Sequence, residues 1–381
     1  MTVTGDTTER SAQRPTPEPS SGPGTTTQAM KDAVKRPTAF DRFADWVSEA
    51  MGRPMNIAFW FVLFTTSCFA NVLGLNISSA FNSAVTVYVM IPLLLIPQMI
   101  LSGLLFPFDK LNNLLSTKGK VPVVADLMVS RWAFEAMAVH QFLENEFEAP
   151  YNHYRKEEAI ADFKSAYLAD EVKRRNNFVL DNFENKNDSV KGLVVKELEV
   201  LHSIIIDEPF RQGLEKINID KDLTPQKYSV AVGEQLDSFA EQYRNYYQAV
   251  YNKNVELIEK KMSFFEKKGY PVNEEKNLYF NESLSDLVKN VSVKNRWIEY
   301  HGQIIQQIDP IFQSPKPRNA LDYRTHFFSP EKNFLGLRLS TFLFNIIVIW
   351  AMTGLFYLSL YFEWYKKLVD LFSKVNIPKR K

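Results

Sequence analysis

Few residues in this chain have the type and spacing that catalysis or metal binding requires. Gly119 and Lys120 lack the preceding glycine of a phosphate-binding loop and are followed by Val121, so they cannot cradle phosphates. The five histidines form no His-x-x-x-His or His-Glu-x-x-His pair. The one cysteine, Cys68, excludes a thiolate cluster and an intrachain disulfide. We therefore expect no enzyme activity, no metal site and no cofactor in this chain.

The remaining candidate site residues are polar side chains within long apolar stretches. They are Asn71, Gln98 and Asn345. The favoured interpretation is that they form hydrogen bonds between membrane helices, and the alternative is that they line a substrate pathway. No Asp, Glu, Lys or Arg lies in these stretches, which argues against a proton-coupled pathway.

Two uncharged blocks contain these residues, one from Pro54 to Phe108 and the other from Leu339 to Phe362. A helix needs about 20 apolar residues to cross a bilayer core of roughly 30 Å. The blocks therefore predict an integral membrane protein with three transmembrane helices, because helical segments of a soluble core are shorter. The predicted spans are residues 57–75, 85–106 and 339–362, with a polar break at 76–82 between the first two.

Charge gives conflicting information about orientation. The total of 45 basic and 44 acidic residues provides no basic surface for nucleic acid, so we expect no nucleic-acid partner. Basic residues in the tail 366–381 predict a cytoplasmic C-terminus, which places residues 108–336 outside the cell. Three spans then put the N-terminus outside as well, although its basic residues favour the inside: Lys31, Lys35, Arg36, Arg42 and Arg53. The expected location is the inner (plasma) membrane, with several passes through the bilayer.

The polar region between the second and third spans is expected to be mostly helical. Thr224 as N-cap, Pro225 at the first helical position and Gly269 beyond the last turn predict one long helix. Apolar residues in it recur at steps of three and four, which is typical of a coiled-coil seam. They are Val232, Leu236, Phe239, Tyr243, Tyr246 and Val250. Residues 157–182 or 283–308 could supply the partner helix, and we favour an intramolecular hairpin over an intermolecular coil.

The expected fold class is all-α, and the chain divides by composition. Residues 121–142 have apolar residues at helical spacing, with Asp126, Arg131 and Glu135 among them. This segment either lies at the membrane interface or packs on the soluble domain. The predicted divisions are a disordered segment 1–37, an amphipathic helix 38–55, two transmembrane helices in 56–107, a membrane-proximal helical element 108–142, a helical soluble domain 143–336, the last span 337–365 and a basic tail 366–381.

Two stretches resemble a known family of transporters. Residues 71–112 (NVLGLNISSAFNSAVTVYVMIPLLLIPQMILSGLLFPFDKLN) and 127–142 (LMVSRWAFEAMAVHQF) resemble the last part of the permease domain of G-type ATP-binding-cassette (ABC) transporters. The three spans are similar to the fourth, fifth and sixth membrane helices of that family. DPIFQSP and THFFSPEK, before the last span, are similar to Bacteroidetes versions with a large insertion there.

The resemblance implies a permease without its own ATPase domain, whose partners are the lipid bilayer and an ATP-binding subunit or a second permease copy. Residues 40–60 (FDRFADWVSEAMGRPMNIAFW) resemble the start of low-affinity iron permeases instead. A metal-ion permease and a membrane-anchored helical scaffold therefore stand as alternatives to the transporter permease.

Overall fold

The computed structural model describes residues 54–81, 83–105, 108, 119–208, 213–214 and 219–374. The chain separates into the units Met1–Arg53 and Pro54–Lys381, and the described residues all belong to the second. The predicted segment 1–37 and all but the last two residues of the predicted helix 38–55 lie outside the described part. The same holds for residues 375–381 of the predicted basic tail.

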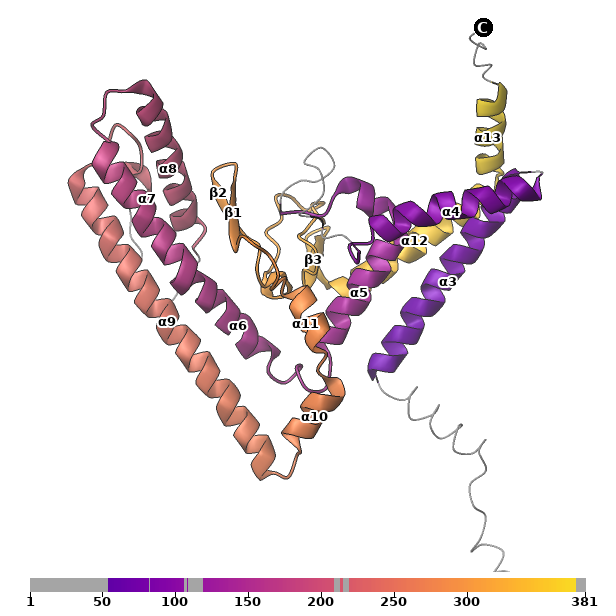
Figure 1. The fold of residues 1–381 in the computed structure, drawn as a ribbon, viewed down its shortest axis with the longest axis horizontal. Helices are drawn as coiled ribbons and strands as arrows, with labels where there is room; N and C mark the ends of the chain where they lie inside the picture. The colour runs from indigo at the N-terminus through magenta and orange to yellow at the C-terminus, as the bar shows by residue number, and fades with distance from the viewer. Residues whose placement is uncertain are drawn as a thin grey trace, which may run out of the picture. The chain divides into compact units, whose positions relative to one another are not determined.

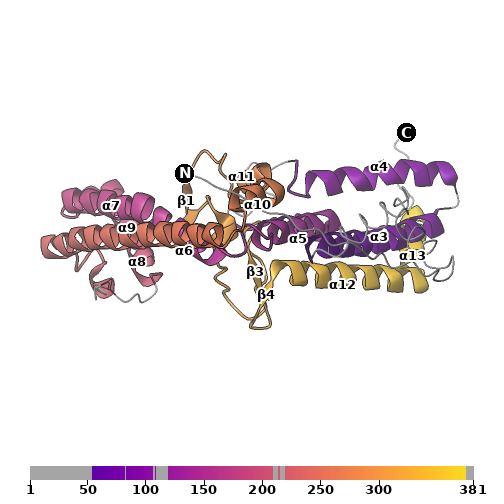
Figure 2. The same cartoon turned by 90° about the horizontal axis from the view of Figure 1, so that it is seen from below.

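Two helices of the described part are long and apolar enough to cross a membrane. They are α3 (Pro54–Ala80) and α12 (Thr341–Tyr361). They pack against each other, and both contact the shorter helix α5 (Val129–Leu143), as Figure 2 shows. Phe69 of α3, Trp132 of α5 and Phe344 of α12 belong to their shared apolar core.

The helix α4 (Ala84–Ile100) is shorter than the span predicted at residues 85–106. Its 17 residues give a length of about 26 Å. The helix ends at Ile100 with Leu101 as its C-cap, and Gly103 in the turn beyond adopts the left-handed conformation with φ +81°. A side chain at Gly103 would lie 2.7 Å from the Phe327 ring, so this tight turn depends on glycine. The structure therefore supports two spans by length, and α4 is a shorter apolar helix.

The polar break predicted at residues 76–82 is partly wrong, because α3 continues through it to Ala80. Asn76 is buried, and its Nδ2 atom donates to the carbonyl oxygens of Val72 and Phe356, both at 2.9 Å. Phe356 belongs to α12. Asn76 therefore joins the two long apolar helices instead of ending the first one.

A helical arm follows α5. It consists of α6 (Asn152–Phe163), the π-helical turn η3 (Lys164–Leu168), α7 (Ala169–Asn182), α8 (Asp188–Ile206) and α9 (Val230–Lys267). The long helix α9 packs against both α6 and α7 (Figure 1). This confirms residues 157–182 as the partner segment and an intramolecular hairpin as the arrangement.

The start predicted for the long helix is wrong. The helix begins at Val230 with Ser229 as N-cap, because Thr224 accepts bonds from the amides of Lys227 and Tyr228 in a separate turn. In the middle of the helix Tyr247 is buried, and the predicted seam residue Tyr246 is partly buried against the same apolar cluster. Buried residues of α9 recur at both seven and eleven residues, as Leu236, Tyr243 and Tyr247 show.

The segment predicted as a second partner helix, 283–308, is not one helix. It contains α11 (Glu282–Val288), which follows α10 (Val272–Tyr279), and then the strands β1 (Trp297–Tyr300) and β2 (Gln303–Gln306). A second hairpin pairs β3 (Glu331–Phe334) with β4 (Leu337–Ser340). The fold is therefore mostly helical but not all-α.

Both hairpins have two-residue turns in which each residue has positive φ. The turn residues are His301 and Gly302 in the first hairpin, and Leu335 and Gly336 in the second. Such turns match the twist of antiparallel strands, and glycine accepts this conformation without steric cost. Short three-residue 3-10 turns complete the fold at η4 (Asp220–Asp222) and η5 (Pro310–Phe312).

Candidate functional site

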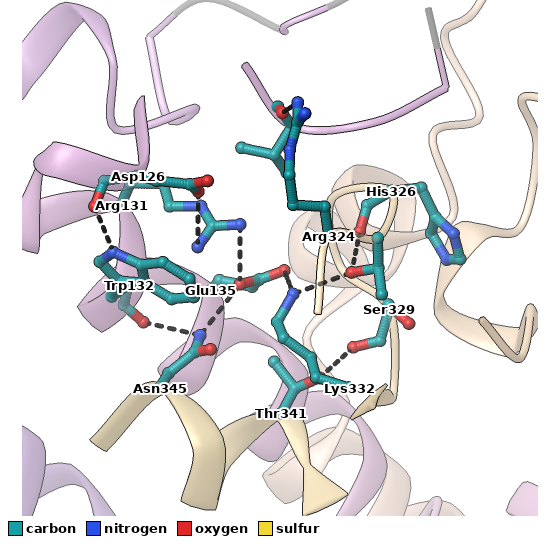
Figure 3. Close-up of polar contacts among 12 residues, drawn as sticks. Asp126, Arg131, Trp132, Glu135, Arg324, His326, Ser329, Lys332, Thr341 and Asn345 are labelled. Carbon is teal, nitrogen blue, oxygen red and sulfur yellow. Dashed lines mark hydrogen bonds and ion pairs between the residues drawn. The ribbon is translucent and has the colours of Figure 1, made fainter. Parts of the chain in front are cut away.

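A group of buried polar side chains lies where α5 meets α12 and the second hairpin. We call it the α5 ion cluster, and it consists of Asp126, Arg131, Glu135, Lys332 and Asn345. All except Asp126 are at most 2% exposed. Figure 3 shows Glu135 between Arg131 and Lys332, with Asn345 below it.

Local structure explains how these residues come together. Arg131 and Glu135 lie four residues apart on α5, so they share one face of the helix. Asp126 lies in the 3-10 turn η2 (Val123–Leu127) that precedes α5. Lys332 is buried on β3, where it faces Leu339 of β4. Asn345 lies near the start of α12, which follows β4 directly.

Glu135 is the centre of the hydrogen-bond network. Its Oε1 atom accepts from Lys332 Nζ at 2.9 Å, and its Oε2 atom accepts from Asn345 Nδ2 at 2.9 Å. Asn345 Nδ2 also donates to the carbonyl oxygen of Trp132 at 3.0 Å. Both partners of Asn345 are acceptors, which fixes the orientation of its amide group. Thr325 accepts a further hydrogen bond from Lys332 Nζ at 2.9 Å.

Arg131 completes the network by charge and by stacking. Its guanidinium lies 3.6 Å from both the Asp126 and the Glu135 carboxylates. The guanidinium carbon also lies 3.8 Å from the centre of the Trp132 ring, a distance suited to a cation–π contact. The Trp132 indole N–H donates to the Asp126 carbonyl oxygen at 2.8 Å. Two cations and two carboxylates therefore balance within one buried site.

The electrostatics of the cluster favour an ionised Glu135. Burial alone would raise the pKa of Glu135. The Arg131 and Lys332 cations and the hydrogen bond from Asn345 outweigh burial, so the pKa of Glu135 lies below its ordinary value. Nearby, burial lowers the pKa of His326 to about 4. In Figure 3 the His326 ring points away from the cluster, and its Nε2 atom lies 2.8 Å from the Pro310 carbonyl oxygen.

Some buried polar atoms in the cluster form no hydrogen bond. Within the described residues, Arg131 Nε, Arg131 Nη1 and Asn345 Oδ1 are buried and have no hydrogen-bond partner. An unmade hydrogen bond of a buried group costs about 1–3 kcal/mol. These atoms are the ones in the cluster that could bind a polar group or change partners when the helices move.

The structure separates the three site residues predicted from sequence. Asn345 is buried in the cluster, where it bonds from α12 to α5. Asn71 is exposed on α3, and the Gln98 side chain on α4 is partly exposed. The main-chain oxygen of Gln98 accepts a hydrogen bond from Ser130 Oγ at 2.7 Å. The three residues therefore do not form one site.

Sequence reasoning missed Lys332 and gave no role to Glu135. The available signal was the pair Arg131 and Glu135, four residues apart among apolar residues. Opposite charges at that spacing within an apolar helix indicate a buried pair that needs further partners. Lys332 carried no such signal, because its burial depends on the hairpin turn at Leu335 and Gly336. The segment 121–142 had been assigned either to the membrane interface or to the soluble domain, and α5 contacts both α12 and α11.

Comparison with known proteins agrees with the membrane assignment. Residues 45–142, which include α3, α4 and most of α5, match the family model described as ABC-2 type transporter. No significant match was found among curated proteins or among solved structures. The matched domain is the membrane part of such transporters, so the match supports a permease component of an ATP-binding-cassette transporter.

Proposed function

We propose that this chain is a three-span permease of the inner (plasma) membrane, that it has no catalytic activity of its own, and that a separate ATP-binding subunit drives it. The ABC-2 match over residues 45–142 supports the transport role. The absence of a phosphate-binding loop motif from the sequence supports a separate source of ATP hydrolysis. A G-type permease with a large insertion before the last span is the finer assignment that we propose.

The properties of α4 support a third span. None of its residues is buried, although nearly all are apolar. A helix that exposes apolar side chains all round is suited to lipid or to neighbouring membrane helices. Leu104 and Leu105 extend the exposed apolar surface beyond the helix end. The length of about 26 Å is short for a core of about 30 Å, but local bilayer thinning accommodates such a mismatch.

The α5 ion cluster supports a coupling role for α5. It ties α5 to α12, the last span, and to the β3–β4 hairpin outside that span. A buried neutral network of this kind has few alternative arrangements, because each charge loses its partners when one element moves alone. We propose that α5, α12 and the hairpin move together in the transport cycle. The Asn345–Glu135 hydrogen bond is the observation that carries this proposal.

The test is to isolate the chain from native membranes after mild cross-linking and to measure ATP hydrolysis in the purified complex. We expect an ATP-binding subunit to co-purify and its ATPase activity to be retained in proteoliposomes. The Asn345→Leu variant should lower that activity about tenfold, because coupling residues of this type contribute up to about 2 kcal/mol.

Asn71→Leu is the matched control, because Asn71 is an exposed asparagine on a neighbouring apolar helix. It should leave ATP hydrolysis unchanged. A chain that purifies without any ATPase activity would contradict the proposal. Equal activity of Asn345→Leu and the native chain would contradict the coupling role alone.

A further inference from the structure

A short amphipathic helix follows the last span almost directly. It is α13 (Trp364–Lys374), and only Phe362 and Glu363 separate it from α12. Glu363 has φ +54°, and its amide donates to the Leu360 carbonyl oxygen at 3.2 Å. Figures 1 and 2 show that α13 leaves the line of α12 at this turn. The change of direction is therefore a defined helix end rather than a continuation of the span.

The helix presents a row of exposed apolar side chains. Trp364, Leu368 and Leu371 are 53%, 49% and 61% exposed and share one face through their spacing of four and three residues. The neighbouring Tyr365 and Val369 are partly covered. Tyr365 contacts the Phe81 ring, which lies just beyond α3, with 6.4 Å between ring centres. One edge of the apolar face thus packs on the protein, and Trp364 stacks on the Phe362 ring with 5.4 Å between ring centres. Leu368 and Leu371 remain exposed among the described residues.

Basic side chains flank this apolar row. Lys366 and Lys367 lie on the polar side of α13. Lys367 Nζ also donates to the Phe362 carbonyl oxygen at 3.0 Å, which satisfies one of the free carbonyls at the end of α12. Exposed Tyr361 and Phe362 continue the apolar row back to the end of the span. Aromatic residues next to basic ones are typical of the membrane–water interface.

We propose that α13 lies in the surface of a bilayer rich in anionic phospholipid, with Trp364, Leu368 and Leu371 in the acyl boundary and the two lysines at the headgroups. Continuity with α12 fixes the depth of the helix, because a span that ends at Tyr361 leaves the next residues at the interface. An apolar face beside a polar face that carries Lys366, Lys367 and Asp370 matches this environment, since the apolar residues gain burial and the lysines gain attraction to phosphate. Binding at the surface would fix the rotation of α12 and so the position of Asn345.

The experiment places a fluorescent probe on each face of α13 in the full chain. Leu368→Cys and Asp370→Cys are made in a Cys68→Ser background, labelled with an environment-sensitive dye and reconstituted into nanodiscs. The nanodiscs contain phosphatidylcholine with phosphatidylglycerol, together with a lipid that quenches within the acyl region. Reconstitution itself reports insertion of the spans. We expect the Leu368 probe to be quenched severalfold more strongly than the Asp370 probe, because the two positions face opposite ways on the helix.

The charge requirement is tested with Lys366→Gln/Lys367→Gln, and the matched control is Lys366→Arg/Lys367→Arg. The glutamine variant should lower the ratio of membrane-bound to free α13 about fivefold for each lysine in phosphatidylglycerol nanodiscs. It should have little effect in phosphatidylcholine alone, and the arginine variant should behave like the native chain. Equal quenching of the two probes would overturn the proposal. A Leu368 probe that is shielded from water but not quenched by the lipid would also overturn it, because that result indicates a protein partner.

Discussion

Two buried cations in this molecule are satisfied in different ways. Lys332 in the α5 ion cluster is 1% exposed, and its partner Glu135 is fully buried. Arg175 on α7 of the arm is also 1% exposed, and it forms ion pairs with Glu171, Glu197 and Glu299. Those three carboxylates remain 13%, 19% and 22% exposed. All three anions that pair with Arg175 therefore touch water, whereas Glu135, the anion that pairs with Lys332, does not.

This difference predicts how each site responds to the loss of its cation. In the arm, water can hydrate the carboxylates that Arg175 leaves behind, which limits the penalty. In the α5 ion cluster, the loss of Lys332 leaves Glu135 with less compensation in a buried site, and an unpaired buried charge is expensive. The strength of an ion pair thus depends on what replaces the missing partner rather than on its distance alone.

The largest expected effect comes from Lys332→Met. We expect the free energy of unfolding to fall by about 3–5 kcal/mol, because Glu135 loses its closest cation in a buried site. The measurement is thermal unfolding of the detergent-solubilised chain. The double variant Lys332→Met/Glu135→Gln should recover more than half of the loss, since a neutral glutamine still accepts from Asn345. Equal losses in the single and double variants would contradict the charge argument.

Arg175→Met should have the second largest effect. Three ion pairs are lost, but the partly exposed carboxylates regain water, so we expect a loss of about 1.5–3 kcal/mol. The same unfolding measurement applies, with Arg174→Met as control, because Arg174 pairs with Glu171 from an exposed position. A loss equal to that of Lys332→Met would break the contrast between the two sites.

Asp309 sharpens the comparison because its pKa shifts in the opposite direction to that of Glu135. Burial raises the pKa of Asp309 to about 6, against the opposing charge of Lys289. Asp309 thus contributes stability that is fully present below pH 3.8 and is lost as the pH rises through about 6.

Asp309→Asn removes this titration and keeps a residue that tolerates the observed φ of +52°. At pH 7.5 the variant should be more stable than the native chain by about 1–2 kcal/mol, and at pH 4 the two should be alike. Unfolding scans at the two pH values check this. A gain of the same size at both values would show that charge is not the cause.

The smallest effect is expected at an exposed ion pair of the arm. Lys173 and Glu241 lie 3.4 Å apart, with side chains 44% and 69% exposed. Lys173→Met should change stability by less than about 0.5 kcal/mol, because water and salt screen such pairs. A clear loss in the same unfolding assay would mean that exposure does not rank the ion pairs of this protein.

The sequence predicted local features well where neighbouring residues decide them. The end of α9 before Gly269 was predicted, because a left-handed glycine ends a helix wherever it occurs. The hairpins were missed, although Gly302 and Gly336 mark their turns, because the short strands had been assigned to a helical region. Tyr247 was missed from the buried face of α9, because a strict alternation of three- and four-residue steps places Tyr246 there instead.

The amino-acid sequence alone was enough to predict a membrane protein, because uncharged blocks of this length are suited to lipid. It also predicted the long helices, since spacing and capping act over a few residues, but it placed a helix where the β1–β2 hairpin lies. The contact between Lys332 and Glu135, which are 197 positions apart in the chain, follows from the folding of α5 against the second hairpin. The fold also places Asn345 in the buried cluster and leaves the side chains of Asn71 and Gln98 exposed or partly exposed. Burial and pairing depend on contacts between distant segments, and no local pattern contains that information.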